Sequence, residues 1–135
     1  MTKAVIAVLI ACLSSAAHAF SGADLLGQCK DFVRALDGEK IDLNQSLQAG
    51  LCGGYIHGVQ EGFTASSELS FIASEDQGTA PVSAKYWDVP EDMEAEKVVK
   101  IVVRYLEINP EMQSKPAVLS VISALIQTFP VEAKD

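Results

Sequence analysis

The positions of Cys29 and Cys52 constrain the fold of this chain more than any other feature. Each cysteine lies on a stripe of apolar residues at three- and four-residue spacing, and the turn-forming residues 37–40, DGEK, separate the two stripes. If both stripes are helical, the cysteines lie about 12 and 15 Å from the turn, so an antiparallel hairpin brings them level. The pattern therefore predicts two helices joined by a buried disulfide.

The first twenty residues indicate that this bond can form. They read MTKAVIAVLIACLSSAAHAF, in which a lysine, an apolar run and small residues make up a cleavable secretory signal. We predict cleavage after Ala19, which leaves residues 20–135 as a single exported domain in an oxidising compartment. A lipobox-like context makes lipidation of Cys12 the alternative, and either route exports the chain. No later run is long and apolar enough to span a membrane.

Two helices are predicted in the N-terminal half of the exported domain. The first runs to Leu36 from Ser21, whose hydroxyl suits an N-cap. The second has its cap at Asp42 or Asn44. Its buried stripe consists of Cys52, Ile56, Val59 and Phe63.

Two further helices are predicted in the C-terminal half. The third has an apolar stripe over residues 95–106 that is broad enough to be buried on two sides, and Asn109-Pro110 stops it. The fourth runs from Ser114 to Pro130, with Pro116 in its first turn. Its polar face is predicted to hold Ser120 and Ser123. Because no strand pattern occurs, we predict a small all-α domain of four, or four to five, helices with one disulfide.

Three glycines, Gly54, Gly58 and Gly62, repeat at four-residue spacing in the second helix, with Tyr55 beside them. A glycine costs about 1 kcal/mol in a helix interior, so three on one side indicate that another backbone approaches there closely. We predict a helix-packing motif. Its neighbour is another helix of the chain or a second subunit, because the spacing fits both.

Residues 64–92 form the least regular stretch and are predicted to be a loop that contains three turn formers, Gly78, Pro81 and Pro90. A loop of this length needs attachment to the core. The residues expected to provide it are Phe71, Ile72, Tyr86 and Trp87.

Most of the negative charge is concentrated near this loop. Loss of Lys3 with the signal leaves nine basic and 18 acidic residues, a net charge of −9, which disfavours nucleic acid and anionic membranes as partners. Between residues 68 and 96 eight acids stand against Lys85 alone. They form either a solvated loop and helix N-terminus or a docking surface for a basic protein. The predicted contact residues are Glu75, Asp76, Tyr86, Trp87, Asp88, Glu91, Asp92 and Glu94.

No pattern in the sequence predicts catalysis. The chain lacks a glycine-rich phosphate loop, HxxxH or CxxC metal spacing, a nucleophile elbow and an EF-hand loop. His57 stands one turn from Glu61 without a second histidine or a cysteine on its own face, so we interpret the two as a solvated pair. We therefore predict no enzymatic activity, no metal and no cofactor.

Two separated motifs resemble the Rap/Tai family of type VI secretion immunity proteins. They are CGGYIHGV at residues 52–59 and VVRYLEINPE at residues 102–111, preceded by the export signal and Cys29 and followed by a helix that ends Phe129-Pro130. The resemblance covers nearly all of the exported chain. It implies a small, all-helical periplasmic protein, often a homodimer, that neutralises an injected toxin by binding it. The toxins paired with the best-known members are peptidoglycan amidases.

The chain departs from the family pattern at one pair of positions. Family members usually carry a second cysteine pair, and the corresponding positions here are Asp88 and Val131. Both cysteines are absent together, as the loss of a disulfide predicts. The resemblance therefore implies a looser join between residues 64–92 and the C-terminus.

The leading hypothesis is a periplasmic immunity protein that binds and neutralises a secreted type VI effector with a basic surface, a peptidoglycan amidase by resemblance. One alternative is a periplasmic chaperone of the acid-stress type, which exposes apolar surface as its carboxylates become protonated. Another is an orphan binding protein of the same fold. An enzyme would require a catalytic site that the sequence does not indicate.

Overall fold

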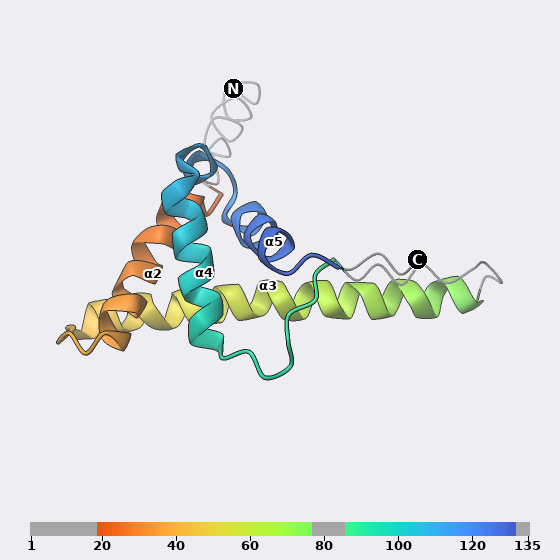
Figure 1. Cartoon of the computed structure of the whole chain (residues 1–135), viewed down its shortest axis with the longest axis horizontal. Coiled ribbons are helices and arrows are strands. Elements are labelled where there is room, and N and C mark those ends of the chain that lie inside the picture. The colour runs from red at the N-terminus through yellow and green to blue at the C-terminus, as the bar shows by residue number, and fades with distance from the viewer. Residues whose placement is uncertain (1–18, 77–85, 132–135) are drawn as a thin grey trace, which may run out of the picture.

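The computed structural model describes residues 19–76 and 86–131, which fold into four α-helices and one 3-10 helix. In chain order these are α2 (Gly22–Leu36), α3 (Leu43–Asp76), α4 (Ala95–Ile108), η1 (Pro110–Ser114) and α5 (Ala117–Thr128). Figure 1 shows α2, α4 and α5 gathered along one part of α3, which runs the length of the molecule. The predicted all-α fold is confirmed. Gly78, Pro81 and all of the predicted signal except Ala19 lie outside the described residues.

Local signals start the first two helices, and end the first, as predicted. The Ser21 hydroxyl accepts a hydrogen bond from the Asp24 amide at 3.2 Å, and the Asp24 carboxylate accepts one from the Ser21 amide at 2.9 Å. Gly38 follows α2 with a φ of 81°, a conformation that favours glycine. Of the two candidate caps for α3, Asp42 is used: its Oδ1 accepts from the Gln45 amide at 2.8 Å.

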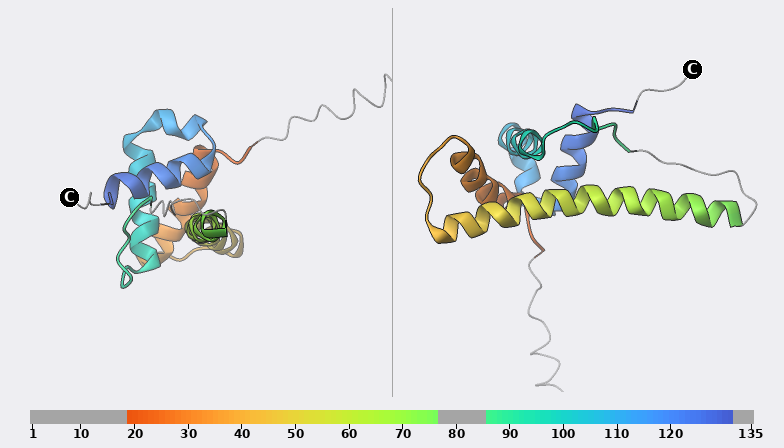
Figure 2. Two further views of the ribbon diagram at one scale, coloured as in Figure 1. Left: turned by 90° about the vertical axis from the view of Figure 1, so that its right-hand side faces the viewer. Right: turned by 90° about the horizontal axis from the view of Figure 1, so that it is seen from below.

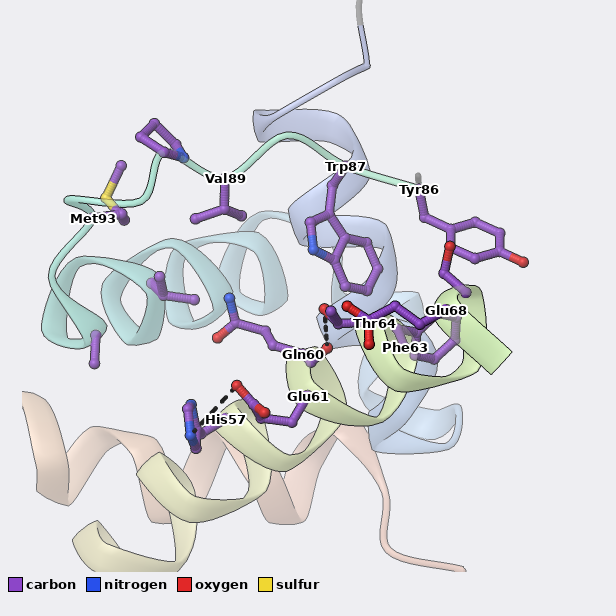
Figure 3. Close-up of a pocket in the computed structure, with 14 residues that line it drawn as sticks. His57, Gln60, Glu61, Phe63, Thr64, Glu68, Tyr86, Trp87, Val89 and Met93 are labelled. Atoms are coloured by element: carbon purple, nitrogen blue, oxygen red, sulfur yellow. Dashed lines mark hydrogen bonds and ion pairs between the residues drawn. The ribbon is translucent and has the colours of Figure 1, made fainter. Parts of the chain in front are cut away.

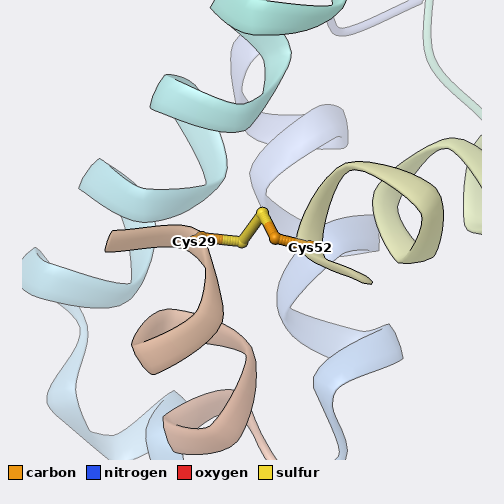
Figure 4. The surroundings of a disulfide bond; sticks show 2 residues. All are labelled: Cys29 and Cys52. Carbon is orange, nitrogen blue, oxygen red and sulfur yellow. A yellow bond between two sulfur atoms is a disulfide. The ribbon is translucent and has the colours of Figure 1, made fainter. Parts of the chain in front are cut away.

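The predicted disulfide joins α2 to α3. The sulfur atoms of Cys29 and Cys52 are 2.07 Å apart and the Cα atoms 5.1 Å apart, and both residues are fully buried. Figure 4 shows the bond crossing between the two helices. These two helices also make the most extensive helix–helix contact in the fold. The bond therefore closes a hairpin that apolar packing already holds together.

The second helix is longer than predicted. Residues 64–76 were expected to be a loop, but α3 continues through them to Asp76 and contains 34 residues, about 50 Å of helix. Two features explain the difference. No glycine or proline occurs between Gly62 and Gly78 to stop the helix, and the Ser70 hydroxyl is satisfied within it by the Ser66 carbonyl at 2.8 Å and does not compete for a backbone amide. Figure 1 and the right view of Figure 2 show this end of α3 extending beyond the other helices.

The four residues predicted to anchor the loop have different positions. Trp87 is 8 % exposed and belongs to the core, as predicted. Ile72 is 58 % exposed, so its prediction was wrong: it lies on the projecting end of α3, which no other helix covers. Tyr86 is 47 % exposed and packs only partly. The side chain of Phe71 lies outside the described residues.

The third predicted helix, α4, packs against α2, α3 and α5, as the breadth of its apolar stripe indicated. It ends at Ile108, just before Asn109-Pro110. The next five residues form η1, so α5 begins at Ala117, with Pro116 at the N-cap position and not in the first turn. The buried residues of α4 are Val98, Val99, Val102, Val103 and Leu106.

The prediction that Ser120 lies on a polar face was wrong. Ser120 is fully buried, and its hydroxyl donates a hydrogen bond to the Met112 carbonyl at 3.4 Å, which satisfies the buried group. A small side chain is required because α5 meets the start of α2 here. The Gly22 amide donates to the Lys115 carbonyl at 2.8 Å, and a Cβ on Gly22 would collide with the Met112 carbonyl. Ser123 is partly buried.

Among the described residues, the predicted glycine motif contacts no other helix. An added Cβ at Gly54, Gly58 or Gly62 would meet nothing within 4 Å, so all three face open space. The first of the two predicted neighbours, another helix of the same chain, is therefore wrong. Tyr55 instead packs on Phe20 with ring centroids 4.9 Å apart, and its partial burial raises the pKa of the phenol above its usual value.

Candidate partner-binding cleft

Three aromatic side chains gather where residues 86–89 cross α3. The ring centroids of Phe63 and Trp87 are 5.3 Å apart, and Tyr86 packs edge-on against Phe63 at 5.5 Å. The Asp88 amide donates to the Phe129 carbonyl at 2.9 Å, which fixes the segment to the end of α5. Phe63 thus comes from α3, and Tyr86 and Trp87 come from the segment that crosses it.

A cleft of about 550 Å³ lies between α3 and residues 86–95. Its apolar side consists of the aromatic rings together with Val89, Met93 and Val98. Its polar side is one face of α3, from His57 to Glu68. Figure 3 shows these two sides opposed, with Gln60 and Glu61 below and Trp87, Val89 and Met93 above. Such a volume suits a ligand or side chain and is too small for a second helix.

The charges around the cleft have one sign. Glu61 and Glu68 line it, and none of its lining residues is a lysine or arginine. Within residues 86–96 the sequence adds five acids and no base. Lys85 and Lys97 flank these residues in the sequence, and Lys97 forms an exposed ion pair with Glu94 at 3.1 Å. An approaching cation therefore meets a mainly negative rim, and an anion is repelled.

The predicted contact residues fall into three groups. Tyr86 and Trp87 line the cleft, although the burial of Trp87 leaves little of its indole to a partner. Asp88, Glu91, Asp92 and Glu94 are exposed on the segment beside the cleft. Glu75 and Asp76 belong to the last turn of α3, and their side chains lie outside the described residues.

Sequence reasoning missed the contribution of α3 to this site. Phe63 was assigned to a buried stripe only, and Glu68 to a loop. Glu61 and Glu68 stand seven residues apart, which is two helical turns, so they share one side of α3. That spacing could have identified the pair had the helix been extended beyond residue 64.

Within the part of the chain that the structure describes, no group of three or more histidine, cysteine, aspartate or glutamate residues could hold a metal ion. His57 Nε2 lies 3.9 Å from Glu61 Oε1, and both side chains are exposed, which confirms the predicted solvated pair. An exposed pair of this kind contributes little to stability. The cleft is therefore suited to binding through shape and charge.

Comparison with known proteins identifies the family of the chain. The family profile of the Rap1a immunity proteins matches residues 21–131. The chain belongs to the Rap1a immunity protein family. This confirms the resemblance read from the two sequence motifs. No curated protein and no solved structure gave a significant match.

This Rap1a family member has a hydrogen bond near the predicted second cysteine positions. The Asp88 amide bonds to the Phe129 carbonyl, two residues before Val131, so the two segments lie side by side. Packing of the neighbouring Trp87 into the core adds to this join. The contacts seen between these two segments are non-covalent, and the looser join stays a prediction. Separately, none of the helices in residues 19–76 and 86–131 combines the length and apolar character needed to cross a membrane.

Proposed function

We propose that this Rap1a family member binds a type VI antibacterial effector in the periplasm and blocks it by occupying its surface, without turnover. Family membership supports the immunity function, and the secretory-signal pattern of the first nineteen residues supports the periplasm. The expectation that the effector is a peptidoglycan amidase rests on the resemblance. The observation that carries the proposed binding mode is a cleft with aromatic walls inside an acidic rim.

This arrangement matches the general anatomy of protein interfaces. Aromatic residues at the centre supply most of the binding energy, whereas rim charges accelerate association and set its dependence on salt. The effector surface that meets the rim is therefore basic. Glu91 and Asp92 are exposed and are the acids best suited to test this, because the neighbouring Glu94 stands at the N-cap of α4 and pairs with Lys97.

The first test is capture of the effector on the immobilised protein, residues 20–135. We expect a secreted protein to elute from a lysate of the same species at high salt, and its purified form to hydrolyse peptidoglycan until the protein is added. The variant E91K/D92K should associate about tenfold more slowly at low salt, and the difference should shrink in 0.5 M NaCl because screening weakens rim charges.

The matched control is E107K/E111K, which reverses two exposed acids at the opposite end of α4. Its association rate should stay within about threefold of the parent protein. Equal rates for the parent and for E91K/D92K would move the effector site elsewhere. Retention of no peptidoglycan-degrading protein at either salt concentration would contradict the proposed function.

We also propose a homodimer formed through the outer face of α3. The glycines of the motif face open space, which leaves a second subunit as the neighbour that their spacing indicated. Exposed apolar side chains lie on the same face as the glycines, from the start of α3 to its projecting end. At 100° per residue, these side chains and the glycines fall within an arc of about 100° on the side of the helix away from Cys52. These side chains are Leu43, Leu47, Leu51, Leu69 and Ile72.

The dimer is tested by light scattering coupled to size-exclusion chromatography at about 100 µM protein, a concentration that populates even a weak dimer. The parent protein should run at twice the chain mass and G58K at the chain mass, because a lysine would stand in the middle of the face. The control G27K changes a glycine of α2 that also faces open space. A parent protein that is monomeric, or a G58K variant that remains dimeric, would contradict this interface.

A further inference from the structure

Resting on the proposed function, we propose that the cleft between α3 and residues 86–95 receives an arginine side chain from the effector. The volume of about 550 Å³ is in the range of pockets that hold small ligands. It accommodates one long side chain and its adjoining backbone. The chemistry of the two walls then decides which side chain fits.

The polar wall selects a cation. Glu61 and Glu68 line the cleft from positions two turns apart on α3, about 10 Å apart along the helix axis. A cation between them can bond to either carboxylate, and no lysine or arginine among the lining residues competes for them. His57 also lines the cleft, and its Nε2 lies 3.9 Å from Glu61 Oε1.

The apolar wall favours arginine over lysine. Phe63 and Tyr86 present ring surfaces within the cleft, and the mostly buried Trp87 packs against Phe63. A guanidinium is planar and weakly hydrated, so it stacks on an aromatic ring and bonds a carboxylate in the same plane, whereas the ammonium of lysine is compact and strongly hydrated. Val89 and Met93 can cover the aliphatic part of the side chain.

Trp87 makes the inference testable without the effector, because it is the only tryptophan in the chain and lines the cleft. The probe is the peptide acetyl-Gly-Gly-Arg-Gly-Gly-amide, titrated into residues 20–135 while the single indole N–H signal is followed by NMR. We expect a saturable shift with a dissociation constant of about 1 mM, as for one buried side chain. The same peptide with citrulline, the neutral isostere of arginine, should bind at least fivefold more weakly.

Substitution of the acids gives the second arm. The variant E61Q/E68Q keeps the shape of both side chains and should weaken arginine-peptide binding about tenfold. The control E107Q/E111Q removes the same charge from exposed sites outside the cleft and should leave binding unchanged. An indole signal that does not shift, equal binding of the citrulline peptide, or equal binding of a lysine peptide would each overturn the inference.

The outcome is separable from that of the proposed function. An effector that is captured and neutralised while the arginine peptide leaves the indole signal unchanged would remove the arginine site and keep the immunity function. Saturable arginine binding without any captured effector would keep the arginine site and remove the immunity function. If both hold, E61Q/E68Q should also slow the capture of the effector.

Discussion

Replacing Cys29 and Cys52 together by alanine is expected to lower the free energy of unfolding by about 3 kcal/mol. The bond closes a loop with a sequence separation of 23, and in the chain-entropy model a loop of this length restricts the unfolded state by about that amount. Loss of two fully buried sulfur atoms adds a smaller packing cost. For a domain of this size the total is a large share of the stability.

Urea denaturation of the oxidised parent protein, the reduced parent protein and the double alanine variant measures this effect. The reduced protein and the variant should unfold at similar, lower urea concentrations, and reductant should not affect the variant. If the reduced protein unfolded at the same midpoint as the oxidised one, the bond would contribute nothing to stability. Two freely alkylatable thiols in protein purified from the periplasm would show that it does not form there.

Replacing Trp87 by alanine is expected to cost about 3–5 kcal/mol, the range for truncating a large buried aromatic side chain. The indole is 8 % exposed and packs against Phe63, and it belongs to the same core as the disulfide. Its removal also detaches residues 86–89 from α3. The variant should therefore lose effector binding through unfolding as well as through the loss of one wall of the cleft.

The control for this substitution is Tyr86→Ala at the neighbouring position. Tyr86 is 47 % exposed, so its truncation should cost less than about 1.5 kcal/mol. Thermal denaturation of both variants by circular dichroism distinguishes the two roles. Similar losses of stability for both would mean that Trp87 is not the core residue that its burial indicates.

The sequence predicted the features that depend on local chemistry or on apolar spacing. Ser21 and Asp42 cap helices because their side chains bond to nearby amides, and Gly38 adopts a positive φ because the turn requires it. The pairing of Cys29 with Cys52 followed from two stripes and a short turn. Each of these predictions needed only residues that are neighbours in the chain or in one helical hairpin.

Features that depend on tertiary context could not be predicted in the same way. Ser120 has the composition of a polar face, but Gly22 and Met112 approach it so closely that only a small residue fits. The cleft brings Glu61 and Glu68 of α3 together with Trp87, which comes later in the chain. The sequence does not determine how the chain returns to place Trp87 beside α3. The length of α3 was underestimated because serine-rich, exposed turns resemble a loop when they lack the periodicity of a buried face.

The projecting end of α3 and the part of α3 that packs in the core should differ in their resistance to local unfolding. From Thr64 to Ala73 only Ser67 is partly buried among the described side chains, whereas Cys52 and Ile56 are in the core. Fraying of the distal turns therefore exposes little apolar surface and does not require the cooperative unit around the disulfide to melt. A partner could reshape this arm at small energetic cost while the remainder stays rigid.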